Sequence, residues 1–309
     1  MKKSNFIKDN NVVAGVLEAL LLVGLVAIIL SFIQLYYVPE IMEDKEATHM
    51  DLVCQQFSQL KSVIEIQSIM GIINDENPNP KFITYTSMSS PITLGSRQLP
   101  YFVSSASPGQ IALIDKNDAN ESKITIDPPP LPLAYDYPFI PLTSIKYEAF
   151  NYYFIPQKYI FEGGGIILNQ ADGEVMSVNP SMNIINNSND IEIIYDIPIF
   201  IGTPGKKING GYDLSYIRTN YIRYYEGSQN NVSEISIYTQ YPNAWYHCLV
   251  NTTRGLLWEY VKNNDIKVEL DKSTTPNRII ITPDSKNIFV KITLIEIGVQ
   301  IGPGAVISK

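Results

Sequence analysis

The chain has 309 residues, of which 45% are hydrophobic and 17% charged, so it can bury a sizeable core and is not a disordered chain. Its net charge of -8 at pH 7 argues against a nucleic-acid partner, because Lys and Arg contacts to phosphates hold such partners. Two Cys and two His are too few for a structural zinc site or a disulfide framework. We therefore expect a folded protein that binds no nucleic acid, metal or other cofactor.

The amino-terminal part of the chain contains one long apolar stretch. Residues 1–11 form a basic leader, and residues 12–38 would extend about 40 Å as a helix, against a hydrocarbon core of about 30 Å. The Leu, Ile, Val and Phe side chains between Val16 and Leu35 favour the membrane by about 4–8 kcal/mol, which exceeds the ~3 kcal/mol cost of Glu18 at mid-bilayer. The sequence therefore predicts a transmembrane helix whose partner is membrane lipid.

The charges that flank this stretch predict its orientation. Lys2, Lys3 and Lys8 precede it, whereas residues 40–46 are mainly acidic. By the positive-inside rule the amino terminus is cytoplasmic and the remaining chain is extracellular. A cleaved secretory signal is the alternative, but the apolar run is longer than the usual 7–15 or so residues and its far end lacks an Ala-x-Ala-like site.

The amino terminus resembles a known class of signal. A short basic leader, small residues at the junction and Glu18 early in a long apolar helix resemble the class III signal of type IV pilins and archaeal pilin-like surface proteins. The resemblance implies that the leader is cut and that Glu18 aligns a subunit with its neighbour during assembly. The junction departs from the archaeal pattern, because Lys8-Asp9 is followed by Asn10-Asn11 rather than by Ala or Gly. An uncleaved, permanent anchor therefore stays open.

Residues 39–71 are predicted to continue as a stalk helix. The segment to Met70 lacks Gly and Pro after Pro39 and carries an apolar stripe with alternating spacings of three and four. Two heptads are short for a coiled coil, so we expect the stripe to pack on the protein's own outer domain. Gly71 is a natural helix stop, and residues 72–80 are interpreted as a linker. The stripe consists of Met50, Val53, Phe57, Leu60 and Ile64.

Residues 81–309 are predicted to form a β-rich outer domain. Short β-like runs are separated by turn residues, which is typical of an antiparallel sandwich or curled sheet. Residues 241–262 are the exception and predict one helix or two short ones, with Pro242 at the start. The fold class expected for the whole chain is α+β. The β-like runs include KFITYTS, QIALID, SKITID, NYYFIP, KYIFEGGGIIL, DIEIIYDIPIFIG, YIRYYE, EISIYTQ, DIKVEL, NRIIIT and NIFVKITLIEIGVQIG.

The resemblance seen at the amino terminus continues into the outer domain. The tract NYYFIPQKYIFEGGGIIL, the PNAW helix and the terminal hydrophobic strand are similar to those of a group of archaeal pilin-like membrane-anchored proteins. No catalytic residues come with this resemblance.

Two kinds of modification are predicted for an extracellular domain. Cys54 and Cys248 either form a disulfide between stalk and outer domain or remain two unpaired thiols. Four Asn-x-Ser/Thr sequons agree with exposure outside the cell, although Asn251 falls inside the predicted helix and is the poorest of them. The sequons begin at Asn120, Asn186, Asn231 and Asn251.

The sequence offers no catalytic constellation. The turn at residues 202–207 lacks the Gly spacing and the hydroxyl of a phosphate-binding loop, and residues 163–165 are interpreted as a tight turn or bulge. His247 adjoins Cys248, but consecutive side chains diverge on a helix or strand. We therefore expect a protein that is not an enzyme.

The sequence suggests three functions. The first is a pilin-like interaction protein, either a filament or a minor-pilin subunit, that packs against pilin-like neighbours through its apolar helix. The second is a permanently anchored envelope protein whose β head binds a ligand or partner. The third, an ectoenzyme, lacks a base–nucleophile pair.

Overall fold

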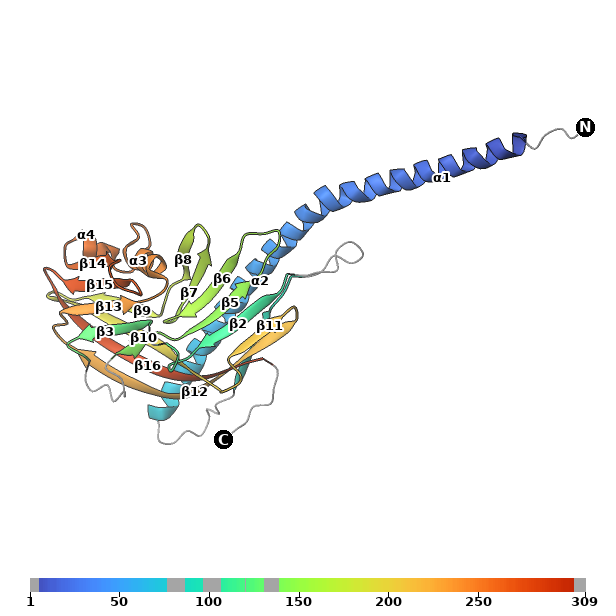
Figure 1. Ribbon diagram of the computed structural model, residues 1–309. Helices are drawn as coiled ribbons and strands as arrows, with labels where there is room; N and C mark the ends of the chain where they lie inside the picture. Colours follow the sequence, from blue (N-terminus) through green and yellow to red (C-terminus); the bar gives the residue numbers. More distant parts are fainter. Residues whose placement is uncertain (1–5, 77–86, 97–106, 120, 131–138, 303–309) are drawn as a thin grey trace, which may run out of the picture.

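A long helix carries a β-rich head in the computed structural model of the chain (Figure 1). Asn120, most of the predicted linker, and the predicted strand KFITYTS apart from its last residue lie outside the residues that the structure describes. The structure describes residues 6–76, 87–96, 107–119, 121–130 and 139–302, and it describes side chains from residue 13 onward.

The helix runs without a break from the leader to the head. Helix α1 (Phe6–Phe32) is followed by a π-helical turn, η1 (Ile33–Tyr37), and by helix α2 (Val38–Glu76). The π turn ends two residues before Pro39, and this wider turn lets the helix continue past a residue that lacks a backbone N–H. The helix begins within the predicted leader, so no structural boundary marks residue 12.

The first half of this helix is apolar and exposed. Its most apolar 18-residue window has a mean hydropathy of 2.8, and none of that window is buried. Among the described residues this is the one helix long and apolar enough to cross a membrane. Figure 1 shows α1 projecting away from the head, whereas α2 passes alongside the strands.

Gly71 does not end the helix. Helix α2 continues to Glu76, so the first part of the predicted linker is helical. A Cβ atom at Gly71 would lie 2.3 Å from Cδ2 of Tyr221 on β12 (Leu214–Gln229), too close for any side chain. Glycine is therefore required here by the close approach of the helix to the sheet rather than by a helix cap.

The described residues of the head form three sheets. The first has the order β1-β12-β16-β10-β9, the second β11-β2-β5-β6-β7-β8 and the third β14-β15-β13-β3-β4. The remaining strands of the first sheet are β1 (Met88–Thr93), β9 (Met182–Asn186), β10 (Asp190–Gly202) and β16 (Asn287–Ile301). Those of the second are β2 (Gly109–Ile114), β5 (Ser144–Ala149), β6 (Gln157–Glu162), β7 (Gly165–Gln170), β8 (Gly173–Val178) and β11 (Ile208–Gly211). Those of the third are β3 (Lys123–Asp127), β4 (Ile140–Pro141), β13 (Glu234–Tyr238), β14 (Ile266–Asp271) and β15 (Arg278–Pro283).

The predicted fold class is confirmed: a long amino-terminal helix precedes curled, mainly antiparallel sheets and short helices. One pair departs from the antiparallel pattern, because β10 and β16 run parallel from Asp190 beside Asn287 to Gly202 beside Val299. Burial alternates along the first half of each strand, but residues 197–200 of β10 and residues 292–297 of β16 are buried without interruption, which is typical of strands covered on both faces.

Within the described part of the chain, two hydrophobic cores hold these sheets and helices together. One joins α2 to the first and second sheets, and it contains the whole predicted apolar stripe from Met50 to Ile64. The other lies between the first and third sheets and the short helices α3 (Pro242–Val250) and α4 (Trp258–Lys262), with Trp245 fully buried. The stripe therefore packs on the protein's own head, as predicted, and residues 241–262 form two short helices.

Two turn predictions have different outcomes. Gly163 and Gly164 form the tight turn between β6 and β7, both with positive φ, as predicted. The run NYYFIP was predicted to be a strand, and this is wrong. It forms the loop between β5 and β6, because a helix carboxylate takes up the backbone N–H groups that a strand would use, as described below.

Candidate functional site

Glu18 lies on the exposed part of α1, among apolar side chains that are also exposed. Within the described part of the chain no ion pair reaches this carboxylate. Its carboxylate therefore faces the medium that surrounds α1.

The packing interface between α2 and the head is centred on Phe57. The ring is fully buried, and its centroid lies 6.5 Å from that of Tyr147 on β5 and 6.1 Å from that of Tyr159 on β6. Edge and tilted contacts of this kind add to the free energy gained by burying the ring. The aromatic cluster fixes the helix against the second sheet.

A buried carboxylate fixes the same helix nearer to α1. Glu46 has no exposed surface, and its oxygens accept hydrogen bonds from the backbone N–H groups of Tyr152 (3.1 Å), Tyr153 (2.8 Å) and Phe154 (2.7 Å). The hydroxyl of Ser107 donates to the same carboxylate. Successive N–H groups that converge on one anion form a nest, so this carboxylate fixes the β5–β6 loop on the helix.

A second polar contact lies farther along α2. Lys61 Nζ donates to Glu65 Oε1 (2.6 Å), to the carbonyl oxygen of Gly164 (2.7 Å) and to Ser181 Oγ (3.3 Å). Burial opposes ionisation of Glu65, but the hydrogen bonds from Lys61 and Ser181 outweigh it and lower the pKa of the carboxyl. The ion pair thus ties α2 to the β6–β7 turn.

His49 is buried on the same helix. Its Nε2–H donates to the carbonyl oxygen of Thr93 over 2.9 Å. Burial lowers the pKa of the imidazole, although the hydrogen bond to Thr93 and the charge of Glu46 oppose this. A neutral His49 is therefore part of the packed interface rather than an exposed base.

The end of α2 that lies farthest from α1 carries an exposed apolar ridge. Ile66, Ile69 and Met70 keep the i, i+3, i+4 spacing of one helix ridge and are all more than 40% exposed. Between this ridge and α1, the exposed face of α2 carries polar side chains that include Glu43, Asp51, Gln55 and Gln59.

Two adjoining hollows lie on the head beside α3 and α4. Their volumes are about 780 Å³ and 530 Å³, and both are lined by Thr253 and Arg254. His247 and Asn251 line the first hollow, and Trp258 lines the second. A guanidinium beside an aromatic ring can bind a planar or acidic group.

The two cysteine thiols have different surroundings. Both are free: Cys54 is half-buried on α2, whereas Cys248 is buried on α3 and lies 3.5 Å from Asn179 Oδ1. The structure thus has both thiols free, which is the second of the two arrangements that the sequence left open. Burial raises the pKa of Cys248 to about 12, which makes it a poor nucleophile.

The described sequons are exposed. Asn186 ends β9 and its Oδ1 accepts a hydrogen bond from Lys286, and Asn231 follows β12 with φ of 54°. Asn251 lies just after α3 rather than inside it, and its Oδ1 accepts hydrogen bonds from the backbone and hydroxyl of Thr253. The expectation that Asn251 falls inside the helix is therefore wrong.

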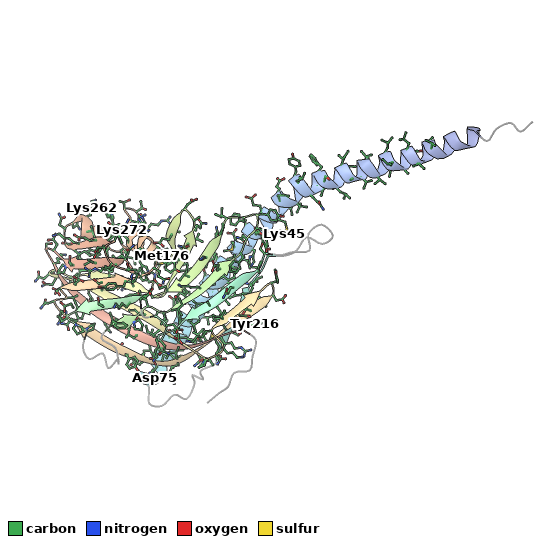
Figure 2. All side chains as sticks on the ribbon, in the orientation of Figure 1. Lys45, Asp75, Met176, Tyr216, Lys262 and Lys272 are labelled. Atoms are coloured by element: carbon green, nitrogen blue, oxygen red, sulfur yellow. The ribbon has the colours of Figure 1, made fainter. Side chains whose placement is uncertain are left out.

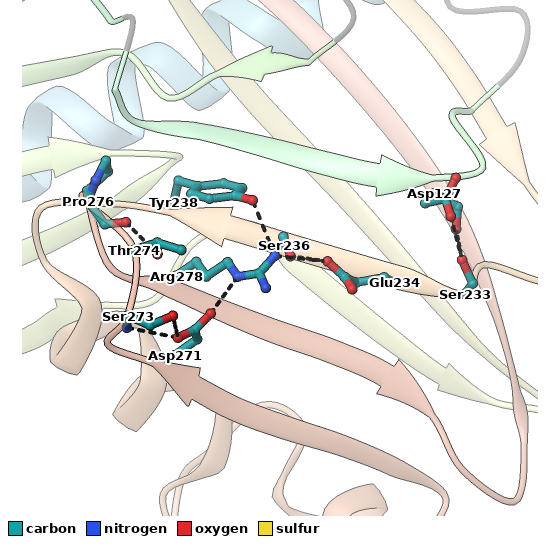
Figure 3. A network of polar contacts seen from close by, with 10 residues as sticks. All are labelled: Asp127, Ser233, Glu234, Ser236, Tyr238, Asp271, Ser273, Thr274, Pro276 and Arg278. Atoms are coloured by element: carbon teal, nitrogen blue, oxygen red, sulfur yellow. Dashed lines mark hydrogen bonds and ion pairs between the residues drawn. The ribbon is translucent and has the colours of Figure 1, made fainter.

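Figure 3 shows a polar network on the third sheet, centred on Arg278. Its guanidinium donates to Asp271 (2.9 Å), Glu234 (3.4 Å) and the hydroxyl of Tyr238 (3.3 Å). Hydrogen bonds from Ser273 and then from Arg278 lower the pKa of Asp271 to about 2. The network links β13, β14 and β15, so it serves to hold the sheet together.

Buried Glu162 is the described carboxyl that most resembles a catalytic group. Burial raises its pKa, although hydrogen bonds from Thr239 (2.6 Å) and Trp245 (3.0 Å) oppose the shift. Both partners are core residues, so the carboxyl stabilises the seat of α3. The described residues contain no group of three or more His, Cys, Asp or Glu side chains that could hold a metal ion.

Comparisons of the chain with protein family models, curated proteins and solved structures find no match. The class of this protein is therefore described by its architecture. A curled β head packs on the second half of a long helix, and the first half of that helix is apolar and exposed.

Proposed function

We propose that the protein is a pilin-like surface protein, held in a membrane by α1, that assembles with neighbouring chains through its helix. The observation that carries this proposal is the division of one continuous helix. The α2 half buries its apolar stripe in the head, whereas the apolar side chains of α1 have no cover within the described chain. Lipid and neighbouring helices are the environments in which such a surface is stable.

Glu18 supplies the specificity of assembly in this proposal. A carboxylate inside an apolar helix is costly in lipid unless a cation neutralises it, and an amino group on a neighbouring chain would do so. The exposed ridge of Ile66, Ile69 and Met70 offers a further apolar contact at the level of the head. The basic leader places the amino terminus in the cytoplasm and the head outside.

Replacing Glu18 with Leu tests the proposal. The Glu18→Leu chain should enter membranes as well as the natural chain, because the helix becomes more apolar, but should lose assembly almost completely. Chemical cross-linking in native membranes, followed by electron microscopy for filaments, measures both properties. Glu43→Leu is the matched control, because Glu43 is exposed on α2 outside the apolar stretch.

A Glu18→Leu chain that assembles like the natural one would contradict the subunit proposal. It would instead favour the second candidate, a permanent anchor with a ligand-binding head. The adjoining hollows that share Arg254 support that candidate. Sequencing the mature amino terminus gives an independent discrimination, since a new terminus within residues 10–16 indicates processing and an intact Met1 indicates a permanent anchor.

A further inference from the structure

The end of the head nearest to α1 carries exposed apolar side chains. The loop between β5 and β6 presents Phe150, Tyr152, Tyr153 and Ile155 to solvent, and Tyr152 is 66% exposed. Residues 150–157 contain no charged side chain. Isolated exposed apolar residues are ordinary, but an uncharged cluster of this kind marks a contact surface.

A second segment adds to this surface. Tyr212, between β11 and β12, is 53% exposed, and Leu214 follows it at the start of β12. The backbone N–H of Leu94 donates to Asp213 across 3.1 Å, and that of Ser96 donates to Ser107 across 3.1 Å. Ser107 in turn donates to Glu46, which also holds the β5–β6 loop. Both segments are therefore tied to the same level of α2. We call these side chains the aromatic collar: Phe150, Tyr152, Tyr153, Ile155, Tyr212 and Leu214.

The collar lies close to the end of the apolar helix. Glu46 is nine residues beyond Tyr37, which corresponds to about 13 Å of helix, and a headgroup layer is about 5–7 Å thick. Residues 13–37 extend about 37 Å, so a tilt of about 35° fits them to the hydrocarbon core and lowers one side of the head. In Figure 2 Lys45 lies at the end of the head from which α1 leaves, whereas Lys272 lies at the opposite end.

We propose that the aromatic collar rests in the headgroup region of the bilayer that α1 spans, so that the head lies against the membrane. This inference depends on the membrane anchoring proposed above. Tyr side chains combine an apolar ring with a hydroxyl that stays hydrated, which is why they gather at membrane interfaces. The hydrogen bonds of the loop backbone to Glu46 keep its side chains directed outward, so little ordering is needed on contact.

Depth-dependent fluorescence quenching tests the contact. The full chain is reconstituted in phosphatidylcholine vesicles that contain headgroup-labelled nitroxide lipid, as Tyr152→Trp, as Tyr212→Trp, and as Lys272→Trp for the control at the far end. The signal of the natural Trp245 and Trp258 is measured in the unmodified chain and subtracted. Both collar variants should be quenched at least about twofold more than the control, since Trp prefers the interface.

A Leu35→Trp chain separates failure of the contact from failure of the anchor. If this chain is quenched but both collar variants are quenched no more than Lys272→Trp, the head stands away from the membrane and the inference is wrong. If Leu35→Trp is also not quenched, the anchoring proposal falls with it. Protection of the collar variants from aqueous acrylamide without lipid quenching would show that a neighbouring chain covers the collar, which also overturns the inference.

Discussion

The Glu46→Ala chain should lose about 3–4 kcal/mol of the free energy of unfolding of its head. The carboxylate is fully buried, and its removal leaves three backbone N–H groups and the hydroxyl of Ser107 without their acceptor. Each buried donor that loses its partner costs about 1–3 kcal/mol, less where water can enter. Denaturant unfolding of the full chain in detergent, followed by near-ultraviolet circular dichroism, measures the loss.

Two further variants make the Glu46 result specific. Glu46→Gln keeps the shape and one acceptor oxygen, so its loss should be about half as large. Glu43→Ala removes an exposed carboxylate from the same turn and should change stability by less than about 0.5 kcal/mol. Equal stabilities for Glu46→Ala and Glu43→Ala would show that the carboxylate does not hold the loop.

The Phe57→Ala chain should lose about 3–5 kcal/mol, because it removes a fully buried ring from between α2 and the second sheet. The cavity would separate the helix from Tyr147 and Tyr159, which are its partners in the aromatic cluster. The same unfolding experiment measures this loss.

Leu52→Ala is the matched control for Phe57, since Leu52 is 41% exposed on the same helix and its loss should stay below about 1 kcal/mol. Phe57→Leu should fall between the two, because it leaves a smaller cavity. A Phe57→Ala loss as small as that of the control would mean that α2 is not an integral part of the core.

The expected losses in the free energy of unfolding arise because the two halves of one helix have different surroundings. Its second half belongs to the core of the head, and the first half has no cover within the described chain. Because α1 continues into α2 without a loop, a force on α1 is transmitted directly to the sheets. The head cannot swing freely on a flexible linker.

The helix was the part of the fold that the sequence predicted best. A buried stripe of regular spacing needs only local periodicity, and every residue from Met50 to Ile64 in that stripe is in the core. Glu46 continues the same spacing four residues before Met50, so a carboxylate on the buried face was a signal that could have been noticed. Its backbone partners in the β5–β6 loop could not have been found, because they lie more than a hundred residues away in the sequence.

The outer domain was predicted in outline and not in detail. Residues 151–156 have β propensity, but propensity cannot reveal that a buried carboxylate binds their N–H groups. Gly71 has the composition of a helix stop, although its role is set by the ring of Tyr221 on a distant strand. The parallel pairing of β10 with β16 and the hollows around Arg254 likewise depend on long-range topology.

Protease treatment of intact cells tests the central claim most directly. Because the claim is that α1 crosses the membrane and carries the head outside, the added protease should degrade the head and leave a membrane-bound fragment that contains α1. The head should be protected only in inside-out vesicles. A full-length chain that stays intact on whole cells, or that remains in the aqueous phase without detergent, would contradict the account.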